Sequence, residues 1–376
     1  MFMRIKEIHA VHVKVPLEVP YVYGRGAMTA FESIIVRIET DDGIIGYGET
    51  APLYRSPTGE AKVLAPLMSG PIRQVLLGRD PFDMEVIIGR VLELARGNVD
   101  VVSGFDLALW DIMGKALHQP VYKLIGGLCQ DSVAVDYTIS ASEPEAMADK
   151  ARKVCGKGFH GVVVKVTGES VKNDVSRVRA VREALPSDHT VRVDCNGVFT
   201  RDSALLFLKK IRSLEIEFVE QPLPAEDIEG SKQCRKVGIP ISIDESLITI
   251  QDALRFVSHS ACDVMNIKIP RVGGLFLAKQ MAAIAAAAGL PVVVGGRTSL
   301  ELSRCASRHF AASTPGAVGR KHEGPGPASQ ALSDDVVSRR TTIDMAAQAK
   351  GHVHLEQKPG LGVDVVWEKV QQYAVK

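Results

Sequence analysis

The sequence predicts an α/β protein in which a parallel β/α barrel carries a smaller α+β domain. Three observations support this fold class. Alternating polar and apolar residues mark antiparallel strands near the N-terminus, short β-branched runs alternate with amphipathic helices from about residue 131, and five of these runs end in a charged residue. Eight β/α units of about 25 to 30 residues each favour a closed barrel. An open doubly wound sheet is the alternative.

The N-terminal part has the pattern of an α+β domain. Residues 33–40 and 44–48 alternate in polarity around an Asp-Asp-Gly turn, which predicts a hairpin. From residue 81 to 116 the apolar spacing becomes helical. We expect an N-terminal α+β domain over residues 1–127, completed by about residues 345–376, which fold back onto it, and a barrel domain over 128–344.

The run Gly46-Tyr-Gly-Glu-Thr-Ala matches the GxGxxA spacing of dinucleotide-binding loops. It follows a hairpin and continues into Pro52 instead of a helix, so the context of a pyrophosphate site is missing. We do not expect nucleotide binding here.

Eight strands are expected in the barrel, with helices between them. The strands are expected at 133–139, 161–166, 191–194, 217–220, 240–244, 263–268, 291–294 and 316–320. Helices are expected at 200–214, 249–260 and 274–288. The carboxyl ends of such strands meet at one mouth of the barrel, where the catalytic residues of this fold lie.

Charged residues end five consecutive strands of this barrel. They are Lys165, Asp194, Glu220, Asp244 and Lys268, at intervals of 29, 26, 24 and 24 residues. Three carboxylates at one point repel each other unless a cation neutralises them, and hard oxygen ligands without Cys or His favour Mg²⁺, with Mn²⁺ as an alternative. A single acid often only caps a helix, but three in register favour a metal site.

Lys165 and Lys268 flank the three acids from the strands on either side. A divalent cation nearby disfavours the ammonium form of a lysine and lowers its pKa towards a value useful for a base. Two lysines that face each other across the mouth can remove a proton from one face of a carbon and deliver one to the other. Either lysine alone could be a solvated residue at a strand end.

Lys165 and the motifs VRVDCNG, FVEQPL, ISIDES and IKIPRVGG closely resemble the muconate-lactonizing-enzyme branch of the enolase superfamily, which also includes mandelate racemase-like proteins. The resemblance covers nearly the whole chain, including PGLGVDV near the C-terminus. It implies a modified (β/α)₇β TIM barrel under an α+β capping domain built from both termini. It also implies Mg²⁺ ligands at Asp194, Glu220 and Asp244, acid/base catalysts at Lys165 and Lys268, and supporting residues at Asn196 and Glu245 that orient the ligands.

One position departs from the family pattern. The family has Lys-x-Lys at the end of the second barrel strand, and this chain has Val163-Val164-Lys165. The lysine that remains matches the one that transfers protons. Either the metal ion suffices to balance the substrate carboxylate, or the substrate carries a cationic group that a second lysine would repel. The second option indicates an amino acid.

Substrate specificity is expected from loops of the capping domain and from the remaining strand ends. Residues 21–28 and 52–59 resemble the loops that close over the pocket in this family. The candidate substrate-binding residues are Arg25, Tyr54, Arg55, Ser140, Arg297, Glu301 and Glu323. The last two could pair with a substrate ammonium group or form structural salt bridges.

The family's shared step is removal of the proton α to a carboxylate, with metal stabilisation of the enediolate. Return of a proton to the opposite face gives a racemase or epimerase, and the two lysines favour this reaction on an amino-acid derivative. A dehydratase of a hydroxylated amino acid, such as a hydroxyproline, is the second interpretation, and a muconate-type cycloisomerase is the third. A non-catalytic binding barrel is the last, and only Val163 favours it.

Composition and charge exclude several other classes. Hydrophobic residues make up 46% and charged residues 24%, as in globular proteins, and the net charge of +1 provides no basic surface for nucleic acid or anionic membranes. Charges in the first seven residues argue against a signal peptide, and six scattered cysteines fit reduced thiols. We expect a cytoplasmic homo-oligomer with a small carboxylate substrate and no nucleic-acid or membrane partner.

Overall fold

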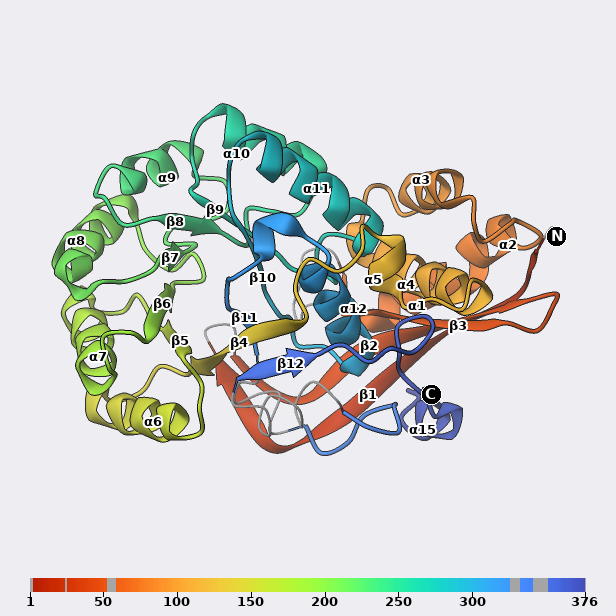
Figure 1. Ribbon diagram of the computed structural model, residues 1–376, viewed down its shortest axis with the longest axis horizontal. Helices are drawn as coiled ribbons and strands as arrows, with labels where there is room; N and C mark the ends of the chain where they lie inside the picture. The colour runs from red at the N-terminus through yellow and green to blue at the C-terminus, as the bar shows by residue number, and fades with distance from the viewer. Residues whose placement is uncertain (1–2, 24–25, 53–58, 325–331, 341–350, 376) are drawn as a thin grey trace.

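The computed structural model describes residues 3–23, 26–52, 59–324, 332–340 and 351–375. Figure 1 shows a curled sheet surrounded by helices on one side and a smaller sheet-and-helix unit on the other. This is the predicted fold class, an α/β barrel with an α+β domain. None of the helices in the described residues has both the length and the apolar content needed to cross a membrane.

The smaller unit is built on a three-stranded antiparallel sheet in the order β1-β2-β3. Its strands are β1 (Ile5–Tyr23), β2 (Gly26–Thr40) and β3 (Ile45–Thr50), and β2 and β3 form the predicted hairpin. Its helical segments are α1 (Ala61–Leu67), the π-helical turn η1 (Met68–Ile72), α2 (Arg73–Leu76), α3 (Met84–Leu94), α4 (Val99–Ala116) and α5 (Val121–Leu124). Nearly all of α4 is buried, because the sheet covers one side and barrel helix α11 (Leu275–Ala287) lies on the other.

Gly46 and Gly48 of the GxGxxA-like run allow β3 to pack directly against the backbone of α4. A Cβ atom on Gly48 would lie 2.0 Å from the carbonyl oxygen of Gly104, and one on Gly46 would lie 2.2 Å from that of Ala108. Such distances are far inside van der Waals contact. These two glycines therefore serve helix–sheet packing.

The larger unit contains eight parallel strands in the order β10-β9-β8-β7-β6-β5-β4-β11. The strands are β4 (Ser132–Ile139), β5 (Gly161–Lys165), β6 (Thr190–Asp194), β7 (Val219–Glu220), β8 (Ile241–Ile243), β9 (Val264–Ile267), β10 (Val292–Val294) and β11 (His322–Glu323). The other helical segments are α6 (Pro144–Gly156), α7 (Val171–Ala184), α8 (Arg201–Ile211), η2 (Arg212–Leu214), α9 (Ile228–Arg235), α10 (Ile250–Ser258), α12 (Glu301–Ala312) and η3 (Pro315–Ala317). The three predicted barrel helices are present, and Thr200 and Thr249 form capping boxes at two of their starts.

The eighth strand was expected at residues 316–320, and this position is wrong. Pro315 begins the short 3₁₀ helix η3, and Gly319 adopts a positive φ of 71° that ends any extended run. The strand follows as β11, which pairs with β4. Among the described residues no backbone ladder joins β11 to β10, but the buried His322 ring accepts a hydrogen bond of 3.0 Å from the Val294 amide.

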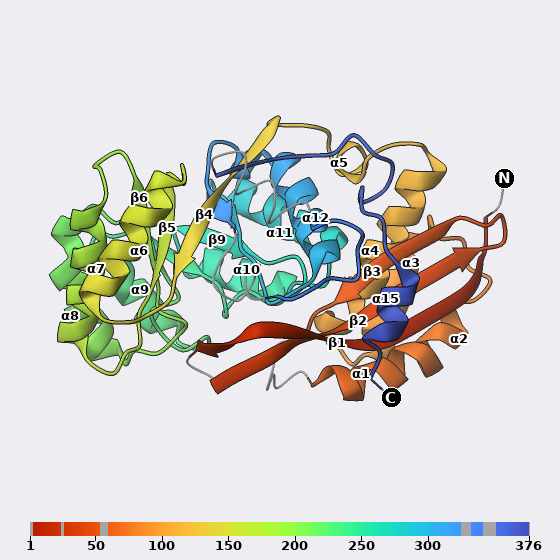
Figure 2. The same ribbon diagram turned by 90° about the horizontal axis from the view of Figure 1, so that it is seen from below.

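The C-terminal segment contacts both units. Strand β12 (His352–His354) pairs antiparallel with barrel strand β4, whereas α15 (Trp367–Gln372) lies against β1 of the smaller sheet, as Figure 2 shows. The Lys14 amide donates to the Tyr373 carbonyl oxygen over 2.9 Å. The predicted return of the C-terminus to the first unit thus applies to its last part. The domain boundaries at residues 127 and 345 stay predictions.

Candidate active site

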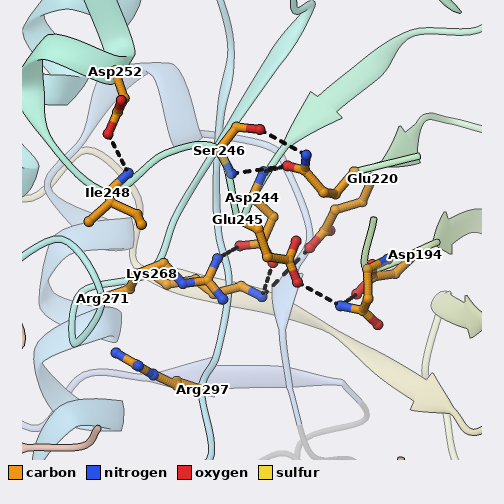
Figure 3. A network of polar contacts seen from close by, with 12 residues as sticks. Asp194, Glu220, Asp244, Glu245, Ser246, Ile248, Asp252, Lys268, Arg271 and Arg297 are labelled. Carbon is orange, nitrogen blue, oxygen red and sulfur yellow. Dashed lines mark hydrogen bonds and ion pairs between the residues drawn. The ribbon is translucent and has the colours of Figure 1, made fainter. Parts of the chain in front are cut away.

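Five charged side chains meet at the carboxyl ends of neighbouring barrel strands. Lys165, Asp194 and Glu220 are the last residues of β5, β6 and β7, and Asp244 and Lys268 directly follow β8 and β9. Parallel pairing sets Lys165 opposite Asp194 and Asp194 opposite Glu220. Figure 3 shows the three carboxylates and Lys268 directed towards a common centre.

The two lysines reach the carboxylates from opposite sides of this centre. Nζ of Lys268 lies 2.8 Å from Oδ2 of Asp244 and 3.6 Å from Oε1 of Glu220. Nζ of Lys165 donates to Oδ2 of Asp194, and to Oδ1 of Asn196 over 3.1 Å. Each predicted catalytic lysine is therefore in contact with at least one predicted metal ligand.

The carboxylates are crowded and almost completely buried, with exposed fractions of 2% for Asp194, 6% for Glu220 and 0% for Asp244. Burial and the charge of Asp194 raise the pKa of Glu220 well above its usual value. For Asp244 the net effect is the opposite. Burial alone would raise its pKa, but the positive charges of Arg271 and Lys268 outweigh burial and hold the pKa of Asp244 well below its usual range. The three carboxylates therefore need neighbouring positive charge to stay ionised together.

The donor set fits a hard divalent cation. Asp194, Glu220 and Asp244 offer only carboxylate oxygens, and the ammonium group of Lys268 already bridges two of them. A magnesium ion prefers such ligands and keeps some positions for water or substrate oxygen. These three residues would hold the ion.

Asn196 and Glu245 lie beside the carboxylates, and their expected role in orienting the metal ligands stays a prediction. Nδ2 of Asn196 donates to Oε1 of Glu245 over 3.1 Å and to Oδ2 of Asp194 over 3.3 Å. Asn196 has a φ of 45°, a left-handed conformation that asparagine tolerates better than most residues. The turn after β6 thus directs the amide between two acids.

Sequence reasoning did not single out two residues that organise the site. Oε1 of Gln221 accepts the backbone amides of Asp244 and Ser246, at 2.9 and 3.2 Å, and so fixes the loop after β8. Arg271 donates to Oδ1 of Asp244. Both lie inside the quoted motifs, directly after Glu220 and three residues after Lys268, and that position was the only available signal.

Two of the candidate substrate-binding residues are engaged in buried ion pairs. Arg297 lies 2.5 Å from Oδ1 of Asp100 on α4, and Figure 3 shows it apart from the carboxylate centre. Glu301 on α12 accepts a hydrogen bond of 2.9 Å from Arg308. These contacts favour structural roles, and the predicted role in substrate binding stays a prediction for both.

The other candidates are placed only in part. Ser140 directly follows β4 and is half-buried at the mouth of the barrel. Arg25, Tyr54 and Arg55 lie outside the described residues, and for Glu323 only the backbone position at the end of β11 is described. Their roles also stay predictions.

Val163 lies on the same strand as Lys165, two residues before it, so the two side chains point to the same face of β5. It is partly exposed and pairs in register with Arg192 of β6 and Thr138 of β4. An apolar side chain therefore occupies the position of the family's first lysine.

Two family models match the chain. Residues 5–126 match the mandelate racemase/muconate lactonizing enzyme N-terminal domain, and residues 146–369 match the enolase C-terminal domain-like model. Together they include all three carboxylates and both lysines described above.

Proteins of known activity align over nearly the whole chain. The N-succinyl-L-Arg/Lys racemase of Bacillus cereus is 32% identical over 99% of this chain and 98% of its own, and its crystal structure superposes with a TM-score of 0.91. The cis-3-hydroxy-L-proline dehydratase of Roseibium aggregatum is 31% identical over 99% of this chain and 100% of its own. The dipeptide epimerase of Enterococcus faecalis, solved with Mg and L-Leu-L-Tyr, is 29% identical, with a TM-score of 0.85 over 96% and 99% of the two chains.

Proposed function

The chain belongs to the mandelate racemase/muconate lactonizing enzyme family of the enolase superfamily, and from this premise we propose that it is a Mg²⁺-dependent racemase or epimerase of an amino-acid derivative. The relatives that act on N-succinyl amino acids and on dipeptides support this substrate class. An N-succinyl amino acid and the C-terminal residue of a dipeptide both have an acylated amino group and a free carboxylate on the same α-carbon, and this carboxylate could bind a metal ion.

The observation that carries the proposal is the placement of the two lysines. Lys165 and Lys268 contact the carboxylate centre from opposite sides, through Asp194 on one side and Asp244 on the other. A substrate held between them would expose one face of its α-carbon to each Nζ atom. One lysine, as the neutral amine, removes the α-proton, and the other, as the ammonium, returns a proton to the opposite face.

Asp194, Glu220 and Asp244 hold the metal ion in this proposal, with Asn196 and Glu245 orienting the acids. A bound Mg²⁺ would supply electrostatic stabilisation of the negative charge that develops on the substrate carboxylate when the α-proton leaves. Arg271, through Asp244, and Gln221, through the loop after β8, keep the ligand positions fixed before substrate binds.

Dehydration of a hydroxylated amino acid is the second candidate function. The relative from Roseibium aggregatum, which is 31% identical over the full length, favours it. In that reaction one lysine removes the α-proton, and the other assists the departing hydroxyl group. Muconate-type cycloisomerisation is the third candidate.

Proton NMR in D₂O tests the proposal directly. Purified protein with Mg²⁺ is incubated with N-succinyl amino acids, dipeptides, hydroxyprolines and muconate, each also after chelator treatment. We expect metal-dependent loss of the α-proton signal and formation of the mirror image or epimer from at least one acylated amino acid or dipeptide. Consumption of a hydroxyproline without any epimer would select the dehydratase instead.

The remaining expectations extend this proposal. We place the capping domain at residues 1–127 with about 345–376, and the barrel domain at 128–344. The small carboxylate substrate would bind between them. Cytoplasmic location and a homo-oligomeric state complete the proposal, and the free cysteines among the described residues fit a reducing compartment.

A further inference from the structure

A second group of polar side chains lies at the opposite end of β5 and β6 from the candidate active site. His160 directly precedes β5 and His189 directly precedes β6, and the two strands pair in register over five residues. The amino ends of these parallel strands bring the two imidazole rings to a centroid distance of 4.9 Å. A five-residue strand spans about 16 Å, so this group is separate from Lys165 and Asp194 at the carboxyl ends.

Asp188 adds a carboxylate to the two histidines. Its Oδ1 lies 3.0 Å from Nδ1 of His189, and one potential ligand atom from each of the three residues lies within 4.8 Å of the others. Two imidazoles and a carboxylate form a ligand set suited to zinc and its neighbours in the first transition row.

The backbone around these side chains is fixed by hydrogen bonds. Arg182 donates to three carbonyl oxygens of the loop before β6, including that of His189 over 2.6 Å. The carbonyl oxygen of His160 accepts the amide of Thr190 over 3.0 Å. Because both segments are held in place, an ion would order only the side chains.

Cys155 at the end of α6 engages the other nitrogen of the His189 ring. Its Sγ lies 3.1 Å from Nε2, so Nδ1 faces Asp188. A partner on the second nitrogen is what orients metal-binding histidines in proteins. An ion bound by Nδ1 and the carboxylate would replace the hydrogen bond that now joins them.

We propose that His160, Asp188 and His189 form a binding site for one Zn²⁺ ion, with water as the fourth ligand and Cys155 bonded to the His189 ring. The ion ties together the loops before β5 and β6, at the end of the barrel that serves stability. It stabilises the folded chain because the unfolded chain does not hold the three ligands together.

Calorimetric titration with ZnCl₂ and thermal unfolding test the site in the full-length protein in excess Mg²⁺. We expect a binding event that weakens by at least about tenfold in His160→Ala and in Asp188→Asn, both at exposed side chains. The accompanying rise in Tm should disappear in both variants and remain in the matched control His354→Ala, which removes another exposed histidine. Binding of Zn²⁺ at the separate carboxylate site should be the same in wild type and in all three variants. Unchanged Zn²⁺ affinity and Tm response in His160→Ala would overturn the proposal.

The absorption spectrum of Co²⁺ in place of Zn²⁺ tests the ligand set. Binding through imidazole and carboxylate gives no intense thiolate charge-transfer band, so wild type and Cys155→Ser should give the same spectrum. A thiolate band that is lost in Cys155→Ser would place sulfur on the ion and overturn the three-residue site.

Discussion

Lys268 and Asp244 follow the neighbouring strands β9 and β8, and their Nζ and Oδ2 atoms lie 2.8 Å apart. The other oxygen of Asp244 accepts from Arg271, so one buried carboxylate compensates two cations. Glu220 is different, because Nζ of Lys268 lies farther from its Oε1 atom, at 3.6 Å. The three proposed metal ligands therefore differ in what their loss does to the metal-free protein.

Glu220→Gln should separate metal binding from stability. Because burial and Asp194 raise the pKa of Glu220, its ionised form is disfavoured without a metal, and the neutral amide should leave the metal-free fold at least as stable as wild type. We expect Mg²⁺ binding to weaken by more than about tenfold and turnover to collapse. Calorimetric titration with Mg²⁺, thermal unfolding and α-proton exchange measure the three effects.

Asp244→Asn provides the contrast. It leaves Lys268 and Arg271 without their shared counter-charge and should cost about 3 to 5 kcal/mol of stability in addition to the metal site. Asp202→Asn, at an exposed acid on α8, is the control that should change neither property. Full metal-dependent turnover in Glu220→Gln would rule out the carboxylate site.

The sequence predicted the mouth of the barrel because polar residues there follow apolar strands at nearly constant intervals. Lys165 and Asp194 end consecutive strands, so parallel pairing of these strands sets them opposite each other, and no long-range contact is needed to predict this. The eighth strand was misplaced because Ala317 and Val318 form a short apolar run. Pro315 begins a 3₁₀ helix just before this run, and Gly319 adopts a positive φ just after it.

Long-range ion pairs could not be predicted from the sequence. Arg297 and Asp100 are 197 residues apart, and they meet only because α4 of the smaller unit packs against the barrel. No periodicity or motif records such a contact. Arg297 therefore looked like a strand-end residue available to substrate, and its buried partner became visible only in the folded chain.

Single lysine substitutions should distinguish a racemase from a lyase. In a racemase, Lys165→Ala abolishes α-deuterium incorporation from one enantiomer while Lys268 still exchanges the other, and Lys268→Ala reverses the preference. Net inversion stops in both variants. NMR of each enantiomer in D₂O measures this, with Lys172→Ala, an exposed lysine on α7, as the control. Loss of exchange from the same enantiomer in both variants would contradict the two-base mechanism.

Val163→Lys tests whether the substrate carries positive charge. The new ammonium group would share a face of β5 with Lys165 and should weaken binding of a substrate with a free cationic group by repulsion. Substrates without a cationic group should be less affected, which a comparison of KM values for the two classes can measure. Val163→Met, of similar polarity, is the matched control. Equal or better activity on the cationic substrate after Val163→Lys would remove this explanation for the missing lysine.

Gly48→Ala should disrupt the contact between β3 and α4. The added Cβ would lie 2.0 Å from the Gly104 carbonyl oxygen, and backbone atoms there cannot rotate away. We expect a loss of about 3 kcal/mol in the free energy of unfolding, measured by denaturant titration. Gly89→Ala is the control, because its Cβ would meet nothing within 4 Å on α3 and should stabilise the helix by up to about 1 kcal/mol. Equal stability of the two variants would contradict the packing role of Gly48.

Asp335 should make stability depend on pH. It is buried beside Glu301 and Glu49, and burial together with these charges raises its pKa to about 8 from a normal value of 3.8. Because the folded pKa lies above the unfolded one, this group's contribution is fully present below pH 3.8 and is lost as the pH rises to about 8. In Asp335→Asn the amide stays neutral throughout, so the variant should escape a loss of up to about 1.4 kcal/mol per pH unit in this window.

Denaturant unfolding of wild type and Asp335→Asn at several pH values between 4 and 8 measures this difference in stability. Asp334→Asn, at the neighbouring acid whose pKa Lys369 helps to lower, should keep the wild-type decline through neutral pH. Parallel stability curves for wild type and Asp335→Asn would show that Asp335 does not hold the proton in the folded state.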